Sequence, residues 1–415
     1  MRKMIGSGVE WIGSVPASWQ TLTIGSLFKV RNEKVNDTDY PPLSVSKGGI
    51  VPQMENVAKS DANDNRKMVL TNDFVINSRS DRKQSCGVSP LDGSVSLINT
   101  VLYPAKGAPI VPAYLNFLLK NYGFAEEFYR WGHGIVADLW TTRWQEMKSI
   151  LLPVPPVEEQ HQILDAIYAQ TDKVDTLIAN VQTQIEKLKA YKQSVITEVV
   201  TKGLDPTVPM KDSGVEWIGE IPSYWKTIRV KQLLQERKER SIDGSEEPLS
   251  MSQKMGLVPT SMLDMVPNIA SSFVGAKFTY VDDLVFNKLK AHLGVFSVSK
   301  YDGLVSPDYA VYYSTGKVHL KYLEYLFKTP QCISEFRKRS TGIAAGLTRL
   351  YTDGLFAIEC PFPDMKEQEA IVKYLNGKCN QINRLIALKQ SKIEKLEQYK
   401  KSLIYEYVTG KKEVI

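Results

Sequence analysis

Two long stretches of the chain carry apolar residues at a seven-residue interval. In the first stretch, the row consists of Ile167, Val174, Val181, Leu188 and Val195, flanked by Leu177, Ile178 and Ile185. In the second stretch, the row consists of Leu375, Ile382, Lys389, Leu396 and Leu403, so a lysine interrupts it. This spacing predicts two helices of about 40 residues and roughly 60 Å, each with a narrow apolar stripe that a partner helix has to cover.

An internal repeat connects the two stretches. Residues 7–19 read SGVEWIGSVPASW and residues 213–225 read SGVEWIGEIPSYW, with nine identities in thirteen positions. The helical stretches 159–203 and 367–411 share 18 of 45 residues. The duplication favours pairing of the two helices within one chain, because each half supplies one partner. A homodimeric coiled coil is the alternative, and the mass of the particle distinguishes the two.

The regions between these repeats, about 20–155 and 226–363, read as mixed α and β structure. Short β-rich runs are bounded by Gly, Asn and Asp, and we expect strands at 42–46, 73–77, 94–98, 248–252, 283–287 and 304–306. A helical segment follows in each half, at 113–130 and 320–338. The tryptophans of the repeated opening segment, Trp11, Trp19, Trp217 and Trp225, are expected to pin each domain onto the helix ends.

The predicted fold class is α+β. It consists of two mixed α/β domains, related by pseudo-two-fold symmetry and separated by two long antiparallel coiled-coil helices. The predicted boundaries are 1–155 for the first domain, 156–204 for the central spacer helix, 205–363 for the second domain and 364–415 for the C-terminal spacer helix.

Composition narrows the class of protein. The 415 residues are 43% hydrophobic and 24% charged, which is ordinary for a globular chain, and the net charge of +6 is compatible with an acidic partner. The four cysteines form no CxxC pair, and no apolar run approaches 18 residues. We therefore expect a reduced cytoplasmic protein without a membrane segment.

Motifs for catalysis are missing from the sequence. An amino-methyltransferase needs an Asn/Asp-Pro-Pro-aromatic loop, and an ATPase needs G-x-x-x-x-G-K-[ST]; neither is present. The four histidines, His133, His161, His292 and His319, lack the spacing of metal ligands. The sequence therefore predicts a non-catalytic chain with no cofactor or metal of its own.

Several motifs together resemble the specificity subunits of type I restriction-modification systems. They are SGVEWIG...P..W in both halves, LPVPPVEEQ at 152–160, CPFPDMKEQ at 360–368, IEKL..YK..(V/L)I.E in both helices, and VTGK at 408–411. The second lead-in departs from the first at Asp364 and Met365. The resemblance covers nearly the whole chain.

The resemblance implies a scaffold that reads a bipartite, asymmetric target in double-stranded DNA, with the helices setting the gap between half-sites. It also implies two docked methyltransferase subunits and, through them, restriction and translocase subunits. S-adenosylmethionine, ATP and Mg²⁺ would belong to those partners. For docking we expect the lead-in residues Glu159, Gln160, Glu367 and Gln368 and the outer helix faces. A stand-alone coiled-coil DNA-binding regulator is the alternative, and it would bind a palindrome as a symmetric dimer.

DNA contacts require Lys or Arg on a common face, and base reading requires polar side chains at the tip of an element. Basic residues follow a buried strand in each half, and others follow the domain helix beside glycines. Two more lie in Ser-x-Ser loops. The candidates are Arg79, Arg82, Lys83, Lys288, Lys290 and His292 after the strands; Arg130, Arg143, Lys338, Arg339 and Arg349 after the helices; and Lys47 and Lys254 in the loops.

Overall fold

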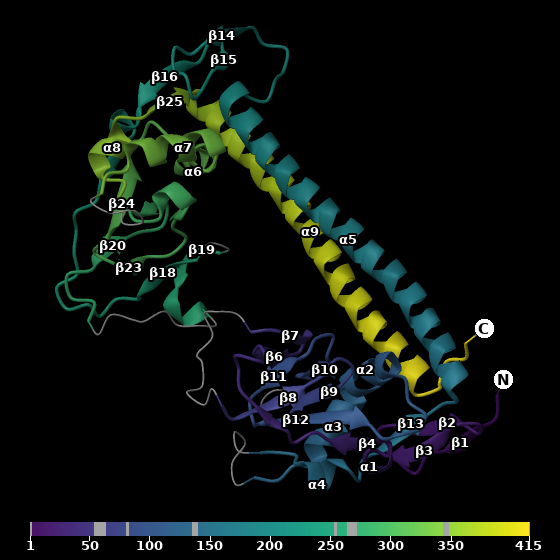
Figure 1. The fold of residues 1–415 in the computed structure, drawn as a ribbon. Coiled ribbons are helices and arrows are strands. Elements are labelled where there is room, and N and C mark those ends of the chain that lie inside the picture. The colour runs from purple at the N-terminus through teal and green to yellow at the C-terminus, as the bar shows by residue number, and fades with distance from the viewer. Residues whose placement is uncertain are drawn as a thin grey trace. The chain divides into compact units, whose positions relative to one another are not determined.

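The computed structural model describes residues 2–53, 64–79, 83–134, 140–252, 255–263, 272–342 and 348–414. They form two compact units (Figure 1). Unit 1 comprises residues 1–182 and 390–415, and unit 2 comprises residues 183–389. Each unit thus joins a globular part to segments of both long helices. The division into four segments that the sequence suggests stays a prediction.

Unit 1 is built on a four-stranded antiparallel sheet in the order β10-β9-β12-β4, with a three-stranded sheet β11-β8-β5 and the pairs β1-β2, β3-β13 and β6-β7. Its elements are β1 (Met4–Gly6), β2 (Ser14–Pro16), β3 (Gln20–Thr23), α1 (Ile24–Leu27), β4 (Phe28–Val30), β5 (Lys34–Val35), β6 (Leu43–Ser46), β7 (Gly49–Pro52), β8 (Arg66–Val69), β9 (Phe74–Asn77), β10 (Cys86–Val88), β11 (Gly93–Val95), β12 (Asn99–Pro104), α2 (Pro112–Lys120), α3 (Tyr122–Arg130), α4 (Trp144–Met147) and β13 (Leu151–Val154).

Unit 2 repeats this plan, and its four-stranded antiparallel sheet has the equivalent order β22-β21-β24-β17. Its elements are β14 (Met210–Asp212), β15 (Glu220–Pro222), β16 (Lys226–Arg229), η3 (Val230–Gln232), β17 (Leu234–Glu236), β18 (Leu249–Ser252), β19 (Gly256–Pro259), η4 (Thr260–Met262), β20 (Lys277–Thr279), β21 (Leu284–Asn287), η5 (Ala291–Leu293), β22 (Phe296–Val298), β23 (Gly303–Val305), β24 (Tyr309–Ser314), α6 (Leu320–Phe327), α7 (Pro330–Arg339), α8 (Thr352–Phe356) and β25 (Glu359–Phe362).

The central strands are buried on both faces, because successive side chains point to opposite sides of a sheet. In β9, Phe74 and Ile76 join the core beneath α2 and α3, whereas Val75 joins a second core with residues of β6 and β7. In unit 2, Phe286 and Val285 of β21 divide in the same way. The predicted strands at 42–46, 73–77, 248–252, 283–287 and 304–306 lie where the structure has them. The run predicted at 94–98 is shorter, since β11 ends at Val95.

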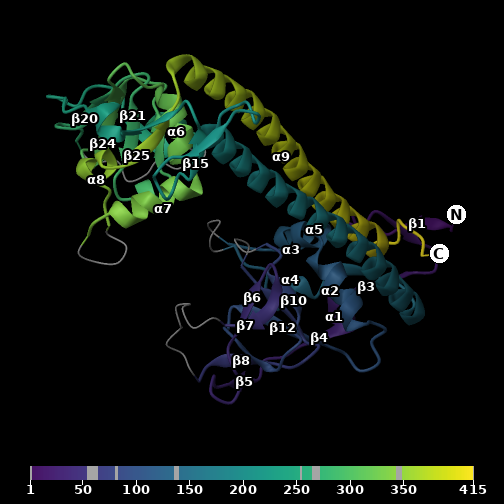
Figure 2. The same ribbon diagram turned by 90° about the horizontal axis from the view of Figure 1, so that it is seen from above.

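The two long helices are α5 (Val157–Lys202) and α9 (Met365–Val408). They lie side by side and antiparallel in each unit (Figures 1 and 2). In unit 1, Lys400 contacts Asp175 at 2.6 Å, and in unit 2 the equivalent Lys192 donates to Asn383 at 2.9 Å. The 46 residues of α5 correspond to about 69 Å at about 1.5 Å per residue. Pairing within one chain is therefore the arrangement found.

The predicted seam is mostly buried. Ile167, Val174, Val181, Ile185, Leu375, Ile382 and Leu403 are in the core. Leu177 is the exception: its side chain is 47% exposed, so its assignment to the second row was wrong. Lys389, which interrupts the seam, donates a hydrogen bond to Gln184. A polar group at this level is thus satisfied by the partner helix.

Each predicted domain helix is two helices in the structure. Asn121 separates α2 from α3, and its side chain accepts a hydrogen bond from the Phe124 amide at 2.9 Å. Thr329 does the same before α7, where Pro330 occupies the first helical position. Asn and Thr caps and a first-turn proline begin helices, so these residues start a new helix where we expected a continuous one.

The opening tryptophans pack as predicted. Trp11 and Trp19 share the unit 1 core with Tyr407 near the end of α9, and Trp225 shares the unit 2 core with Val200 near the end of α5. Trp217 is half-buried against the same core. Among the described residues, no helix combines the length and apolar character that a membrane crossing requires.

Candidate nucleic-acid interface

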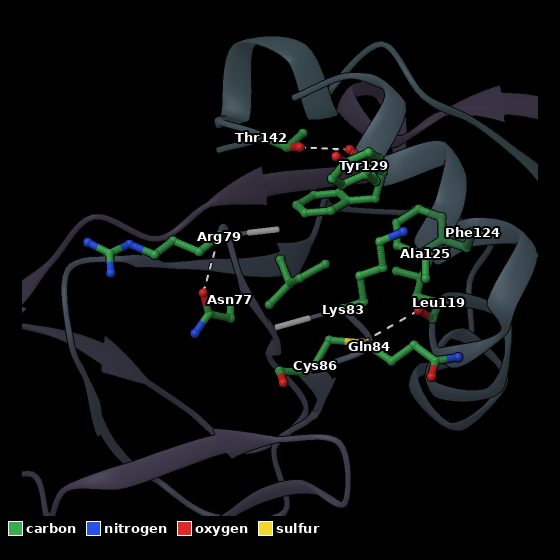
Figure 3. A pocket seen from close by; sticks show the side chains of 13 residues that line it. Asn77, Arg79, Lys83, Gln84, Cys86, Leu119, Phe124, Ala125, Tyr129 and Thr142 are labelled. Atoms are coloured by element: carbon green, nitrogen blue, oxygen red, sulfur yellow. Dashed lines mark hydrogen bonds between the residues drawn. The ribbon is translucent and has the colours of Figure 1, made fainter. Parts of the chain in front are cut away.

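The two basic segments predicted in the first half lie together in unit 1. The loop that follows β9 pairs with the segment before α4, through a backbone bridge between Arg79 and Thr141. The Thr142 amide also donates to the Ser78 carbonyl at 3.0 Å. Asn77 shapes the loop start, because its side chain accepts from the Arg79 amide at 3.0 Å. The side chain of Arg79 is exposed and points away from the neighbouring cavity (Figure 3).

Lys83 lines the same cavity (Figure 3), and its side chain contacts α3. Its ammonium is 2.8 Å from Glu126 and 4.3 Å from the centroid of the Tyr129 ring. The hydrogen bond to Glu126 raises the pKa of Lys83. The cavity measures about 20 Å³, room for roughly one water molecule, so it is no ligand site.

The remaining candidates of unit 1 differ in their charge partners. Arg130 forms ion pairs with Glu10 at 3.1 Å and Glu127 at 3.3 Å, and its exposure makes both pairs weak. Arg143 is exposed, and its amide donates to Glu146 at the start of α4. Lys47 is exposed in the β6–β7 turn. Arg82 lies outside the described residues.

Unit 2 brings its two basic segments together in the same manner. The Leu350 amide donates to the Lys288 carbonyl at 3.0 Å, and Thr341 pairs with Arg349 through a backbone bridge. Lys290 is exposed at the start of η5. His292 is half-buried, and within the described part its Nδ1 has no hydrogen-bond partner.

The other candidates of unit 2 are close to carboxylates. Lys338 and Arg339 share Glu335, at 2.8 and 3.6 Å. Arg349 lies 3.9 Å from Asp308. Lys254 lies outside the described residues. Both units therefore gather cations beside one end of their four-stranded sheet, but with different residues and different partners.

The two glutamines that we expected on a docking surface are buried. Gln160 and Gln368 are 0% exposed, so their side chains offer no surface to a partner. Gln160 accepts from the Val111 amide at 2.8 Å and donates to the carbonyls of Pro109 and Pro155. Gln368 accepts from the His319 amide at 2.8 Å and donates to Pro363. Each glutamine joins the start of a long helix to the globular part of its own unit.

We call these glutamine contacts, between the start of a long helix and the globular part, joints. The neighbouring glutamates bind other segments of the chain at the same two places. Glu159 pairs with Arg2, which also donates to the Gly410 carbonyl just beyond α9. Glu367 accepts from the Tyr224 hydroxyl at 3.0 Å and from the Trp225 indole at 2.8 Å. Both glutamates are partly accessible but already engaged within the chain.

Sequence reasoning missed a repeated arginine–aspartate pair at the opposite end of the central strand from the candidate surface. Arg31 binds Asp73 through two hydrogen bonds of 2.7 and 3.1 Å, and Arg237 binds Asp283 through two of 2.8 and 2.9 Å. These bonds raise the pKa of both arginines. The signal was an Arg-x-Glu motif directly after the first strand of the four-stranded sheet, β4 or β17, and an Asp before the central strand, present in both halves.

No cluster of three or more His, Cys, Asp or Glu side chains suited to a metal ion occurs in the described ranges. The candidate sites are therefore the basic surfaces, one in each unit. Two sheet-based domains, each joined to segments of an intramolecular antiparallel helix pair, define the class of fold. That class is the one found among the solved structures that this chain resembles.

The crystal structure of the HsdS subunit from Thermoanaerobacter tengcongensis matches with a TM-score of 0.51 over 98% of this chain and 99% of that chain, at 15% identity. A chain from a structure on complex assembly and conformational transition of the type I R-M system matches with a TM-score of 0.67, also at 15% identity. It covers 95% of this chain and 98% of the other. At this identity the likeness is one of fold.

Sequence comparison identifies curated relatives. The MjaX specificity subunit of a type I restriction enzyme from Methanocaldococcus jannaschii is 25% identical over 76% of this chain and 71% of its own length. The MjaVIII specificity subunit from the same organism is 24% identical over 64% of this chain and 62% of its own length. No family model matches. The curated homologues of this chain are therefore type I restriction enzyme specificity subunits.

Proposed function

We propose that this chain is the non-catalytic DNA reader of a type I restriction-modification complex, with one half-site of a bipartite, asymmetric target read by each unit. The observation that carries the proposal is the pairing of two basic segments beside the same end of the four-stranded sheet in both units. Because the positions equivalent to Arg79 and Arg143 carry Leu289 and Tyr351, the two units would read different bases.

Docking of two methyltransferase subunits is supported by apolar residues that the helix pair leaves uncovered. In unit 1, Leu177 and Tyr399 are 47% and 52% exposed. In unit 2, the equivalent Leu385 and Tyr191 are 47% and 49% exposed. Large apolar side chains in a repeated pattern are typical of a protein interface. Two copies of one partner would meet the same pair of residues twice.

The chemistry would then belong to the partners, which would hold S-adenosylmethionine, ATP and Mg²⁺. Restriction and translocase subunits would join through the methyltransferases. This chain's own part is recognition, through phosphate contacts that fix its position on DNA and base contacts that select the sequence.

The decisive experiment is co-expression of this chain with the adenine methyltransferase expected in a neighbouring reading frame, followed by genome-wide mapping of methylated adenines. We expect a bipartite, asymmetric motif only when both proteins are present. Methylation by this chain alone would contradict the non-catalytic role. A palindromic motif would favour the alternative of a symmetric coiled-coil regulator.

Point variants assign the half-sites. Arg79→Ala should relax the motif at one half-site and Lys290→Ala at the other, with a cost of about 1–3 kcal/mol where the side chain reads a base. Lys106→Ala is the matched control, since Lys106 is an exposed lysine of unit 1 outside the candidate segments. Equal weakening of all sequences would instead mark a phosphate contact.

A further inference from the structure

A groove in unit 1 runs between the α2–α3 turn and the long helices. Its volume is about 970 Å³. The lining residues that matter here come from three places: Lys47 of the β6–β7 turn, Lys120 at the end of α2, and Lys400 and Lys401 of α9. Tyr122 stands at its rim with 70% of its side chain exposed. Chain segments far apart in sequence thus meet around one open space.

The groove carries excess positive charge. Its four lysines face two carboxylates, Asp175 and Glu397, which leaves a net formal charge of +2. Asp175 is already occupied by Lys400, at 2.6 Å. Within the described residues, no ion pair is found for Lys47, Lys120 or Lys401. Lys120 reaches toward Gly49, so its charge lies close to the turn that bears Lys47.

Unit 2 has a groove of about 700 Å³ that shares only part of this lining, because six of its residues, from α5 and the start of α7, occupy positions equivalent to lining residues of unit 1. Gln193 stands where unit 1 has Lys401, and Thr197 where unit 1 has Tyr405. Its charged lining residues are Glu198 and Lys202, which cancel. The lining of the groove that unit 2 forms is therefore neutral in charge, whereas the lining of the unit 1 groove is basic.

One pair of equivalent positions accounts for part of this difference. Asn116 in α2 and Glu324 in α6 are equivalent, and each accepts a hydrogen bond of 3.2 Å from a backbone amide of the adjacent strand, Val88 or Val298. Glu324 also binds Lys328, the equivalent of Lys120, at 2.5 Å. Asn116 has no charge to offer, so the ammonium of Lys120 is left for another anion.

We propose that the unit 1 groove binds the DNA phosphate backbone, through Lys47, Lys120 and Lys401, and that the unit 2 groove does not. This deepens the proposed function and rests on it, because it adds phosphate contacts from the helix pair to those of the target-recognition surface. Lysine recognises phosphate as a point charge and carries no base information. The groove therefore adds affinity for DNA of any sequence. It adds this affinity only at the half-site that unit 1 contacts.

The test uses the complex with the co-expressed methyltransferase and two fluorescent duplexes, one carrying the mapped motif and one of random sequence. Binding is measured by anisotropy from 50 to 200 mM KCl. For Lys120→Gln combined with Lys401→Gln, the slope of log K against log[KCl] should fall in magnitude by about 2, close to 0.9 per lost phosphate contact. The loss should be equal for both duplexes, and the methylated motif should be unchanged.

Lys395→Gln is the matched control, because Lys395 is an exposed lysine of α9 that does not line the groove. An unchanged slope in the double variant would overturn the inference. So would weakened assembly with the methyltransferase at an unchanged slope, since that would make the groove a protein interface. Failure of the proposed function has a separate signature: the wild-type complex would then methylate no bipartite motif.

Discussion

The two units share their joints but not their charges. In both, a buried glutamine at the start of a long helix binds the backbone of the globular part, and a buried tyrosine binds a carbonyl at the end of the other helix: Tyr114 to Val408 at 2.9 Å and Tyr322 to Val200 at 3.0 Å. Near these joints, however, Lys120 and Lys401 of unit 1 have no ion pair among the described residues, whereas unit 2 has Lys328 paired with Glu324 and the neutral Gln193 at the equivalent positions.

This contrast distinguishes residues that stabilise the fold from residues that would bind DNA. The joints depend on neutral hydrogen-bonding groups that are costly to leave unsatisfied when buried. The groove charges, in contrast, have little to stabilise within the unit. We therefore expect variants at the joints to change stability in both units alike, and variants in the grooves to change DNA binding in one.

The largest effect should come from the glutamines. Gln160→Ala would remove the hydrogen-bond partner of the Val111 amide and of two carbonyls, and Gln368→Ala would do the same to the His319 amide and the Pro363 carbonyl; the bonds to Pro155 and Pro363 are buried. We expect each to lower the free energy of unfolding of its own unit by about 3 kcal/mol. Hydrogen exchange resolved by unit measures this. Gln162→Ala, an exposed site on the same helix, is the control; a comparable loss there would show that the joint is not special.

We expect a smaller effect on stability from the contacts of Glu159 and Glu367, and a different dependence on salt for each. Arg2→Ala removes an ion pair with Glu159 and a bond to the Gly410 carbonyl, and we expect it to cost about 1–2 kcal/mol at low salt and less at high salt. In unit 2, Glu367 is held by neutral donors, so Glu367→Gln should respond less to salt. Exchange protection at the ends of α9 and α5 reports each case. Lys3→Ala is the control, and equal salt responses would contradict the contrast.

The smallest effect should come from Gln193→Lys, which gives unit 2 the cation that unit 1 has at Lys401. If both grooves face DNA in the same way, the salt slope of binding should increase by up to about 1. Salt-dependent anisotropy detects this change. No change in the slope, with a clear loss in Lys401→Gln, would mean that only the first half brings its groove to the phosphate backbone.

Much of the scaffold was predictable because its signals are periodic. The seam of α5, from Ile167 to Val195, predicts the helix pair, and the repeated SGVEWIG segment predicts the duplication. Neither prediction requires knowledge of distant contacts. The split of the domain helices was also readable, since Asn121 and the Thr329-Pro330 pair are helix-starting residues. The surface position of Leu177 was not, because a heptad alone does not say which flank a neighbour covers.

The site residues were less predictable for a physical reason. Arg79 and Lys290 are exposed as expected, but the availability of Lys120 depends on whether position 116 or its equivalent 324 carries a charge, and that requires knowing that the side chains share a helix face against a strand. Gln160 and Gln368 looked like docking residues because they sit in a distinctive motif. Their burial follows from packing between segments about 50 residues apart, which no local pattern reveals.

The glutamine joints also bear on how such a chain can acquire a new target. Every partner of Gln160 and Gln368 described here is a backbone atom: an amide or a carbonyl. Hydrogen bonds made only to the main chain do not depend on which side chains the attached domain carries. A foreign domain of the same fold, brought in by recombination, would therefore find its attachment already complete.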